Sequence, residues 1–383
     1  MIPYGRQSID AEDIRAVIEV LQSDWLTTGP KVNEFEQAFA ARVDAKEAVA
    51  VSSGTAALHA AMYALEIGPG DEVIVPAMTF AATANCVVFQ GATPVFVDVN
   101  PRSLLIDPDQ VEAKITSRTK AVTAVDYSGH PADYDTLRTI TEAHGIALLA
   151  DACHSLGATY KQRSVGSLAD LNMFSFHPVK HIATGEGGMV TTNNSQLARR
   201  MRLFRNHGIT TDLHQREKQG SWFYEMADLG YNYRITDFQC ALGLSQLKRL
   251  SRFLEHRREI ALKYNHAFSS VPVIEPLTVR PDIRHAYHLY VIRVNLESLG
   301  SDRTTLFKTL RNKGIGVNVH YIPVHLHPYY RKTFDTGPGL CPQAEAAYES
   351  ILSIPMFSAI TDDEVETVIS AVLDATAKSS TET

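Results

Sequence analysis

Between residues 47 and 192 the chain alternates short apolar runs with segments of helical periodicity, and this alternation limits the folds open to it. The apolar runs predict strands at 72–76, 94–99, 121–127, 146–151, 171–176 and 188–192, and helices are predicted at 80–89, 110–115 and 136–144. Strands that alternate with helices form right-handed βαβ units on a largely parallel sheet. We therefore predict an α/β protein whose ligand site lies beyond the carboxyl ends of the strands.

The pattern becomes helical again from Thr236, which predicts a linker helix over residues 236–265. Beyond it we predict a strand at 288–294, a helix at 304–312, a strand at 316–321 and two helices ending near Ala377. A chain of 383 residues exceeds the usual size of one domain. We predict a large domain over 1–235, beginning with a helix capped by Asp10, and a smaller C-terminal α+β domain over 266–383.

Charge and cysteine usage exclude several classes of function. The formal charge is -7 with no run of basic residues, so we expect no nucleic-acid partner. The four cysteines are widely separated and form no Cys-x-x-Cys pair, which argues against a disulfide framework or a structural zinc site. No secretory core follows Met1, and no apolar stretch approaches the roughly 20 residues that cross a bilayer. We expect a cytoplasmic protein without a membrane partner.

A first candidate site is the turn Ser53-Gly54-Thr55, which is followed by strong helix formers. Glycine lets the backbone approach a ligand, and the free N–H groups of the helix start stabilise an anion such as phosphate. A Ser-capped helix without any ligand is the alternative interpretation.

Two further candidates follow predicted strands. Asp151 ends the run 146–151, where a carboxylate can keep a pyridine nitrogen protonated; a turn or helix-capping aspartate is the alternative. Lys180 follows the run 171–176 among apolar, glycine and hydroxyl residues, and desolvation there would lower its amine pKa, as imine formation requires. His177 and His181 have the spacing of helical metal ligands, but Pro178 interrupts the helix, so we predict no metal site.

These three clusters together resemble a known family. The segments 53–58, 151–157 and 174–188 resemble, in this order, those of the nucleotide-sugar aminotransferases of the DegT/DnrJ/EryC1/StrS family. The resemblance extends over nearly the whole chain, including 25–30, 231–234 and 319–323. It implies a fold-type I enzyme that depends on pyridoxal 5'-phosphate.

The resemblance also implies roles for individual residues. Lys180 would be the Schiff-base lysine and Asp151 the partner of the pyridine nitrogen. The other implied cofactor contacts are Gly54, Thr55 and Ser175 at the phosphate, Phe80 stacked on the ring, and His154 near the phenolic oxygen. Phe80 has an alternative role as a core phenylalanine.

The resemblance implies a homodimer with shared active sites, because Asn232 matches an asparagine that reaches the cofactor phosphate of the neighbouring subunit. Five residues match nucleotide-sugar contacts, and each has a structural role as its alternative: Tyr4, Thr27, Arg234, His320 and Tyr321.

Within the family, the resemblance extends to the transaminase that uses L-glutamate to aminate the C4 ketone of a UDP-linked 2-acetamido-2,6-dideoxy sugar in pseudaminic acid synthesis. The segments that carry it are 126–129, 174–177 and 243–248. Three alternatives stay open: a transaminase for another UDP- or dTDP-linked 4-keto sugar, a pyridoxamine-dependent sugar 3-dehydratase, and a regulatory protein on the same fold. The dehydratases carry a histidine in place of the lysine, so Lys180 argues against them.

Overall fold

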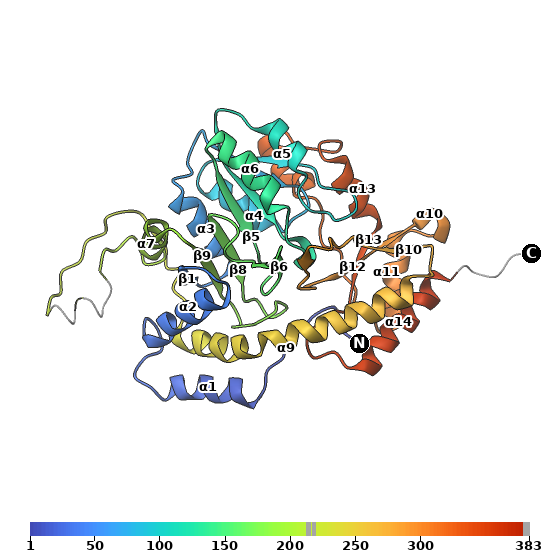
Figure 1. Ribbon diagram of the computed structural model, residues 1–383, viewed down its shortest axis with the longest axis horizontal. Coiled ribbons are helices and arrows are strands. Elements are labelled where there is room, and N and C mark those ends of the chain that lie inside the picture. Colours follow the sequence, from blue (N-terminus) through green and yellow to red (C-terminus); the bar gives the residue numbers. More distant parts are fainter. Residues whose placement is uncertain (212–215, 217–219, 378–383) are drawn as a thin grey trace, which may run out of the picture.

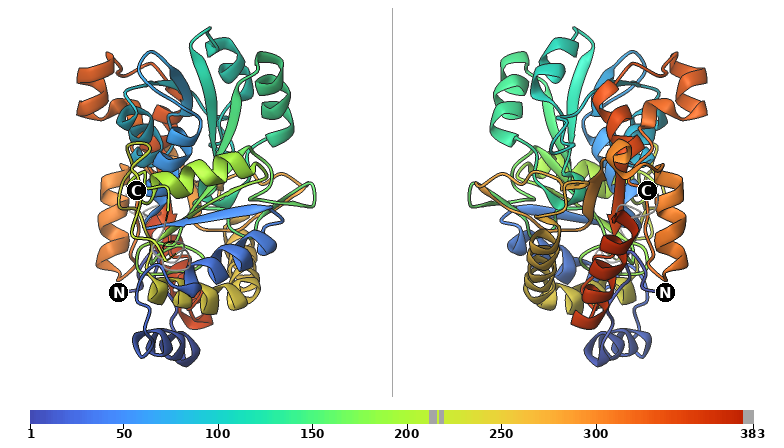
Figure 2. Two further views of the ribbon diagram at one scale, coloured as in Figure 1. Left: turned by 90° about the vertical axis from the view of Figure 1, so that its left-hand side faces the viewer. Right: turned by 90° about the vertical axis from the view of Figure 1, so that its right-hand side faces the viewer.

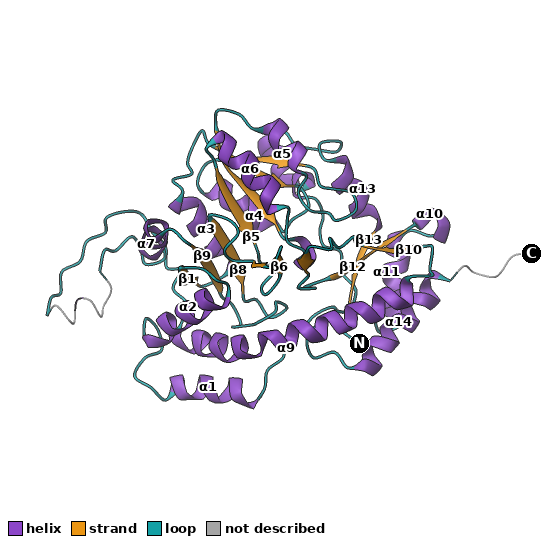
Figure 3. Cartoon of the chain, in the orientation of Figure 1, coloured by secondary structure: helices purple, strands orange, loops and turns teal. Residues whose placement is uncertain are grey.

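The computed structural model describes residues 1–211, 216 and 220–377, and a seven-stranded sheet forms its centre (Figures 1 and 3). The strands are β1 (Glu47–Val51), β2 (Glu72–Pro76), β3 (Thr93–Val97), β4 (Thr119–Val125), β5 (Ala147–Asp151), β8 (Leu171–Ser175) and β9 (Gly188–Thr192). Their order is β1-β9-β8-β5-β4-β2-β3. The neighbours from β8 to β3 are parallel, whereas β9 runs antiparallel to both β1 and β8. The predicted α/β fold with a largely parallel sheet is confirmed.

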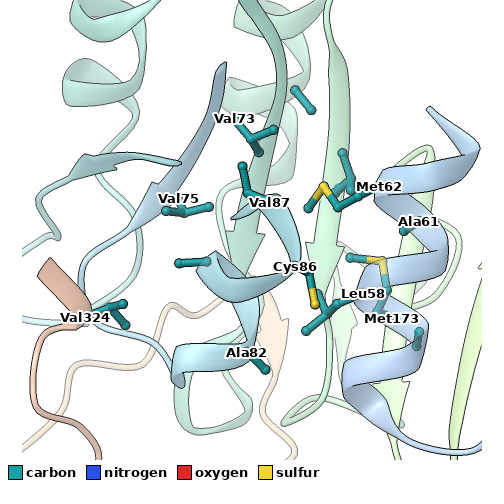
Figure 4. Packing of buried hydrophobic residues seen from close by; sticks show 14 of the residues in the cluster. Leu58, Ala61, Met62, Val73, Val75, Ala82, Cys86, Val87, Met173 and Val324 are labelled. Atoms are coloured by element: carbon teal, nitrogen blue, oxygen red, sulfur yellow. The ribbon is translucent and has the colours of Figure 1, made fainter. Parts of the chain in front are cut away.

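Helices cover both faces of this sheet because successive strand residues point to opposite sides. Val49 and Val51 of β1 join one apolar cluster, and Ala48 and Ala50 join the other. The first cluster includes residues of α3 (Gly54–Ala64), α4 (Ala81–Phe89) and α7 (Ser195–Phe204); the second includes residues of α2 (Pro30–Arg42), α5 (Pro108–Lys114) and α6 (Tyr134–His144). Figure 4 shows part of the first cluster, where side chains of α3 and α4 meet.

Helix α9 (Asp237–Phe268) runs beneath the sheet to the C-terminal part of the molecule, and α1 (Ala11–Leu21) packs against it (Figures 1 and 2). Asp10 caps α1 and Thr236 caps α9, each in a reciprocal capping box. The N-terminal half of α9 packs on the sheet through Cys240 and Leu247, and its C-terminal half packs in a third cluster through Ile260 and Tyr264. Over the described residues, no helix is long and apolar enough to cross a membrane.

The third cluster is built from the C-terminal part of the chain. It includes residues of the sheet β10 (Ile274–Pro276), β12 (Tyr290–Val294) and β13 (Ile351–Ile354), and of the helices α11 (Arg303–Asn312) and α14 (Asp362–Thr376). Two further helices, α12 (Pro328–Phe334) and α13 (Pro342–Ser350), instead contribute Tyr330 and Ala344 to the first cluster. We propose that the chain divides into a large domain over 1–235, a linker helix over 236–265 and a smaller domain over 266–383. Helices α12 and α13 belong to the smaller domain in sequence but pack on the large one.

The predicted strand at 316–321 is wrong. The backbone groups of this segment have hydrogen-bond partners in two different segments. Gly316 N donates to Ile2 O at 2.7 Å, and Asn318 forms an isolated bridge with Ser353. Alternating apolar residues produced the prediction, because Val317 is buried and Val319 packs partly against the core. A ladder needs consecutive pairs with one neighbour, which this segment does not have.

Candidate active site

The carboxyl ends of β5 and β8 bring the two central candidates together. Asp151 is the last residue of β5, and its side chain is only 6% exposed. The hydroxyl of Thr83 donates to Asp151 Oδ2 at 2.7 Å, and the backbone N–H of Cys153 donates to Oδ1 at 3.3 Å. A carboxylate has about four acceptor positions, so this one can still accept a bond from a ring N–H.

Lys180 lies in the half-buried turn after β8, with its N–H donating to His177 O at 2.8 Å. Burial lowers the pKa of its amine, while the negative charge of Asp151 acts in the opposite direction. A lowered pKa increases the fraction of neutral amine, which is the nucleophilic form.

The start of α3 forms a cradle beside these groups. The hydroxyl of Ser53 accepts a hydrogen bond from Ala56 N at 3.0 Å, which caps the helix. A Cβ on Gly54 would stand 2.8 Å from Ser175 Cβ, so only glycine allows this approach of α3 to β8. Thr55 is half-buried at the first turn of the helix, as Ser175 is at the end of β8. Polar groups of both segments and the positive end of the helix dipole suit an anion.

Phe80 is not a core residue. Its side chain is 60% exposed at the start of α4, and its ring centroid lies 5.9 Å from that of Tyr321. Tyr321 in turn pairs with His154, whose Nε2 lies 3.0 Å from the hydroxyl oxygen of Tyr321. An exposed aromatic ring beside a polar site is available to stack on a planar ligand.

Three of the five residues expected to contact a nucleotide sugar lie together. The ring of His320 is 5.3 Å from that of Tyr4 and 5.0 Å from that of Tyr321. The position of His320 is fixed by its Nδ1, 2.8 Å from Ser353 Oγ, and by its carbonyl, which accepts from the hydroxyl of Tyr127. Burial lowers the pKa of His320 to about 4, so its imidazole is neutral at neutral pH.

The other two expected contacts lie in a different place. Thr27 and Arg234 line a cavity of about 1020 Å³ between α2, α7 and residues of the segments 206–211 and 224–235. Arg234 donates to Asn206 Oδ1 at 2.9 Å. Asn232 is exposed and forms a backbone bridge with Asn206.

Sequence reasoning missed two groups that contact the central pair. Thr83 holds Asp151 from 68 positions away, and His288 lies 108 positions from Lys180 with its Nε2 3.5 Å from the lysine Nζ. Of the two histidines that have the spacing of metal ligands, His177 is exposed, and His181 Nε2 lies 3.0 Å from the carbonyl oxygen of Ala286. His288 is the first residue of the predicted strand 288–294, but no spacing rule connects it with Lys180.

The residues present fit pyridoxal 5'-phosphate. The cradle at Gly54 suits the phosphate, Asp151 has acceptor capacity left for a ring nitrogen, and Lys180 offers a desolvated amine. His154 Nδ1 is buried without a hydrogen-bond partner within the described part of the chain, so a polar group of a ligand can pair with it.

Comparison with known proteins agrees with this chemistry. Residues 7–373 match the model of the DegT/DnrJ/EryC1/StrS aminotransferase family. The spore coat polysaccharide biosynthesis protein SpsC of Bacillus subtilis (strain 168) is 45% identical over 97% of this chain and 96% of its own.

Solved structures are similar over almost the same length. Spr1654 from Streptococcus pneumoniae in its PMP form has a TM-score of 0.92 at 33% identity, covering 98% of this chain and 99% of that chain. Its PLP form has a TM-score of 0.91 at the same identity. PseC of Helicobacter pylori, an aminotransferase involved in the biosynthesis of pseudoaminic acid, has a TM-score of 0.91 at 33% identity, with coverage of 98% and 99%. The chain therefore belongs to the DegT/DnrJ/EryC1/StrS aminotransferase family and is a pyridoxal-phosphate-dependent sugar aminotransferase.

Proposed function

We propose that this enzyme transfers the amino group of L-glutamate to the C4 ketone of a UDP-linked 2-acetamido-2,6-dideoxy-hexos-4-ulose. The product would be UDP-4-amino-4,6-dideoxy-N-acetyl-β-L-altrosamine, and 2-oxoglutarate would be released. Support comes from the likeness to PseC over nearly the whole chain and from the motifs at 126–129, 174–177 and 243–248. The greater identity to SpsC, a spore coat polysaccharide biosynthesis protein, is the reason for a second candidate with a different sugar: another UDP- or dTDP-linked 4-keto-6-deoxy sugar.

The observation that carries the chemistry is a desolvated amine at Lys180 near a buried carboxylate at Asp151. Pyridoxal phosphate, when bound, supplies an electron-withdrawing ring that stabilises negative charge at the substrate carbon. Asp151 would hold the ring nitrogen, and Lys180 would bind the cofactor covalently. Once released, the amine of Lys180 would act as the base that takes the α-proton of glutamate and as the acid that returns it.

The remaining contacts follow from the cradle and the ring cluster. Gly54, Thr55 and Ser175 would bind the phosphate, Phe80 would stack on the cofactor ring, and His154 would pair with its phenolic oxygen. Five further residues would contact the nucleotide sugar: Tyr4, Thr27, Arg234, His320 and Tyr321.

We also propose a homodimer in which Asn232 of one subunit completes the phosphate site of the other. Support comes from residues 220–231, which precede Asn232 and lie at the edge of the molecule on the side of α7 (Figure 1). Large apolar side chains among them are exposed: Trp222 by 86%, Met226 by 66% and Leu229 by 69%. Apolar surface of this kind is typical of a protein interface.

An absorbance experiment tests the reaction and its substrate separately. We expect the protein with pyridoxal phosphate to show a visible band of the lysine-bound cofactor, which glutamate removes and the UDP-linked 4-keto sugar restores. Removal by glutamate without restoration by this sugar would leave the aminotransferase chemistry in place and favour the second candidate. If no band forms with wild-type protein and Lys180 stays unmodified after borohydride reduction, the proposed role of Lys180 is wrong.

A further inference from the structure

The amine of Lys180 lies against an imidazole that comes from the opposite part of the chain. His288 Nε2 is 3.5 Å from Lys180 Nζ, at the limit of hydrogen-bond reach. Catalytic hydrogen bonds are often long before the ligands are bound. His288 is only 4% exposed, so water does not compete freely for this contact.

The backbone around His288 is held by the segment that follows β4. Leu289 N donates to Ser128 O at 3.1 Å, and Ala286 N donates to Gly129 O at 3.0 Å. Gly129 has a φ of 104°, and a Cβ there would stand 2.9 Å from His288 N, so this position requires glycine.

A buried arginine fixes the same segment from the other side. One guanidinium nitrogen of Arg257 on α9 donates to the carbonyls of Tyr287 at 3.0 Å, His288 at 3.3 Å and Met356 at 2.9 Å. The ring of His154 lies against the His288 ring, with centroids 4.3 Å apart. Backbone hydrogen bonds and ring packing therefore determine where the imidazole stands.

The imidazole is suited to a neutral amine. Burial lowers the pKa of His288 well below its ordinary value, and the nearby Lys180, His154 and His181 lower it further. His288 Nδ1 is buried without a hydrogen-bond partner among the described residues, and we assign the proton to this nitrogen. Nε2 then accepts an N–H of the lysine, and the lone pair of the amine stays free to take a substrate proton. A carboxylate in this place would stabilise the ammonium form much more strongly than a neutral imidazole does, and would weaken the base.

We propose that His288 is the hydrogen-bond partner that positions the free amine of Lys180 whenever this amine is not bound to the cofactor. The inference rests on the proposed role of Lys180. His288 neither gains nor loses a proton in this role; it holds the base in line with the substrate carbon, and the geometry of the proton transfer depends on it. A misplacement of about 1 Å in such a group can reduce a rate about 10²-fold.

Two substitutions separate the hydrogen bond from the packing. His288→Phe keeps a ring against His154 and removes the nitrogen, while His288→Gln keeps an acceptor near the place of Nε2. The first readout uses the cofactor-free protein: trace acetylation of Lys180 against pH, followed by peptide mass spectrometry, with the exposed Lys248 as the internal reference. Loss of the acceptor destabilises the ammonium form, so we expect the midpoint for Lys180 in His288→Phe to fall by about one to two pH units.

The second readout is turnover of the loaded enzyme. We expect His288→Phe to lower kcat about 10²-fold with little change in KM for glutamate, and His288→Gln to recover most of both readouts. A wild-type labelling midpoint and kcat in His288→Phe would overturn the inference. If His288→Phe does not fold, as judged by its thermal midpoint, His288→Leu replaces it with the same expectations.

Borohydride reduction and peptide mapping of the wild-type holoenzyme distinguish this failure from failure of the proposed function. Attachment of the cofactor to Lys180, together with an unchanged His288→Phe, rejects only the positioning role. Attachment to another lysine rejects the proposed role of Lys180, and the inference with it.

Discussion

Thr83 Oγ1 donates a 2.7 Å hydrogen bond to Asp151 Oδ2, so a residue of α4 fixes the carboxylate at the end of β5. A hydrogen bond to a charged group contributes about 1.5–3 kcal/mol. We expect Thr83→Val to weaken cofactor binding or turnover about 10-fold or more, because the carboxylate loses its orientation. Titration of the cofactor band and kcat measure this effect.

Thr123 provides the matched control, since it is a buried threonine on the neighbouring strand β4 whose hydroxyl has no hydrogen-bond partner among the described residues. Thr123→Val should leave kcat and cofactor affinity unchanged. Equal losses in the two variants would mean that general packing, and not the bond to Asp151, produces the effect.

Lys180→Ala should abolish amino transfer, because one amine serves as the attachment point and as the acid and base of both half-reactions. The cradle at Gly54 remains, so binding of pyridoxamine phosphate should persist at reduced affinity. Calorimetry with this compound and a glutamate turnover assay measure the two effects. Lys248→Ala, an exposed lysine on α9, is the control and should keep full turnover; an active Lys180→Ala enzyme contradicts the assignment.

Loss of the Phe80 ring should weaken cofactor binding more than it lowers the stability of the fold. Its side chain is 60% exposed, so Phe80→Ala removes little buried apolar area and should lower the thermal midpoint of the cofactor-free protein only slightly. An aromatic contact contributes about 0.5–1.5 kcal/mol, which corresponds to a Kd for pyridoxal phosphate raised about 2- to 10-fold. Phe89→Ala, at the other end of α4 and 53% exposed, should leave this Kd unchanged.

A shared active site predicts complementation between inactive subunits. Lys180→Ala lacks the base, and Asn232→Ala lacks the group proposed to reach the neighbouring phosphate. Mixed and re-annealed subunits should form heterodimers in which one of the two sites is intact, so activity should return above that of either parent. Gel filtration checks the assembly. Activity that stays at the parental level in proven heterodimers would mean that Asn232 acts within its own chain.

Stability should fall below pH 6.5 because several histidines are buried in the neutral form. His130 accepts from Arg280 N at 3.1 Å through Nε2 and has Nδ1 2.8 Å from Pro131 O, and burial lowers its pKa to about 4. The unfolded chain therefore binds the proton first, so this contribution is complete above pH 6.5 and is lost as the pH falls toward 4. It amounts to about 3 kcal/mol for one histidine.

Asp126 has the opposite effect on the pH dependence of stability. Burial raises its pKa to about 7, so the folded protein binds this proton before the unfolded chain does as the pH falls. Burial also lowers the pKa of His59 and His320 to about 4, so three histidines outweigh one carboxyl. Thermal midpoints between pH 7 and 4.5 should fall, and less steeply in His130→Gln than in the wild type or in the exposed control His144→Gln. Parallel curves for all three proteins would exclude His130 as a contributor.

The sequence alone determined the elements that depend on local pattern. The predicted run 72–76 coincides with β2, because buried parallel strands are nearly continuous apolar runs, and 171–176 differs from β8 by one residue. Lys180 and Asp151 were recognisable for a related reason, since Asp151 ends one such run, Lys180 comes shortly after another, and the ends of parallel strands meet at one edge.

Only the tertiary structure decided which distant groups meet. The bonds from Thr83 to Asp151 and from His288 to Lys180 depend on how α4 and the segment before β12 pack, and no local periodicity encodes this packing. The segment 316–321 has a strand pattern without a strand, because its backbone groups are paired singly with Ile2 and Ser353. Apolar periodicity records which side of a segment is buried; the partners of its polar groups are fixed only when the whole chain satisfies its hydrogen bonds at once.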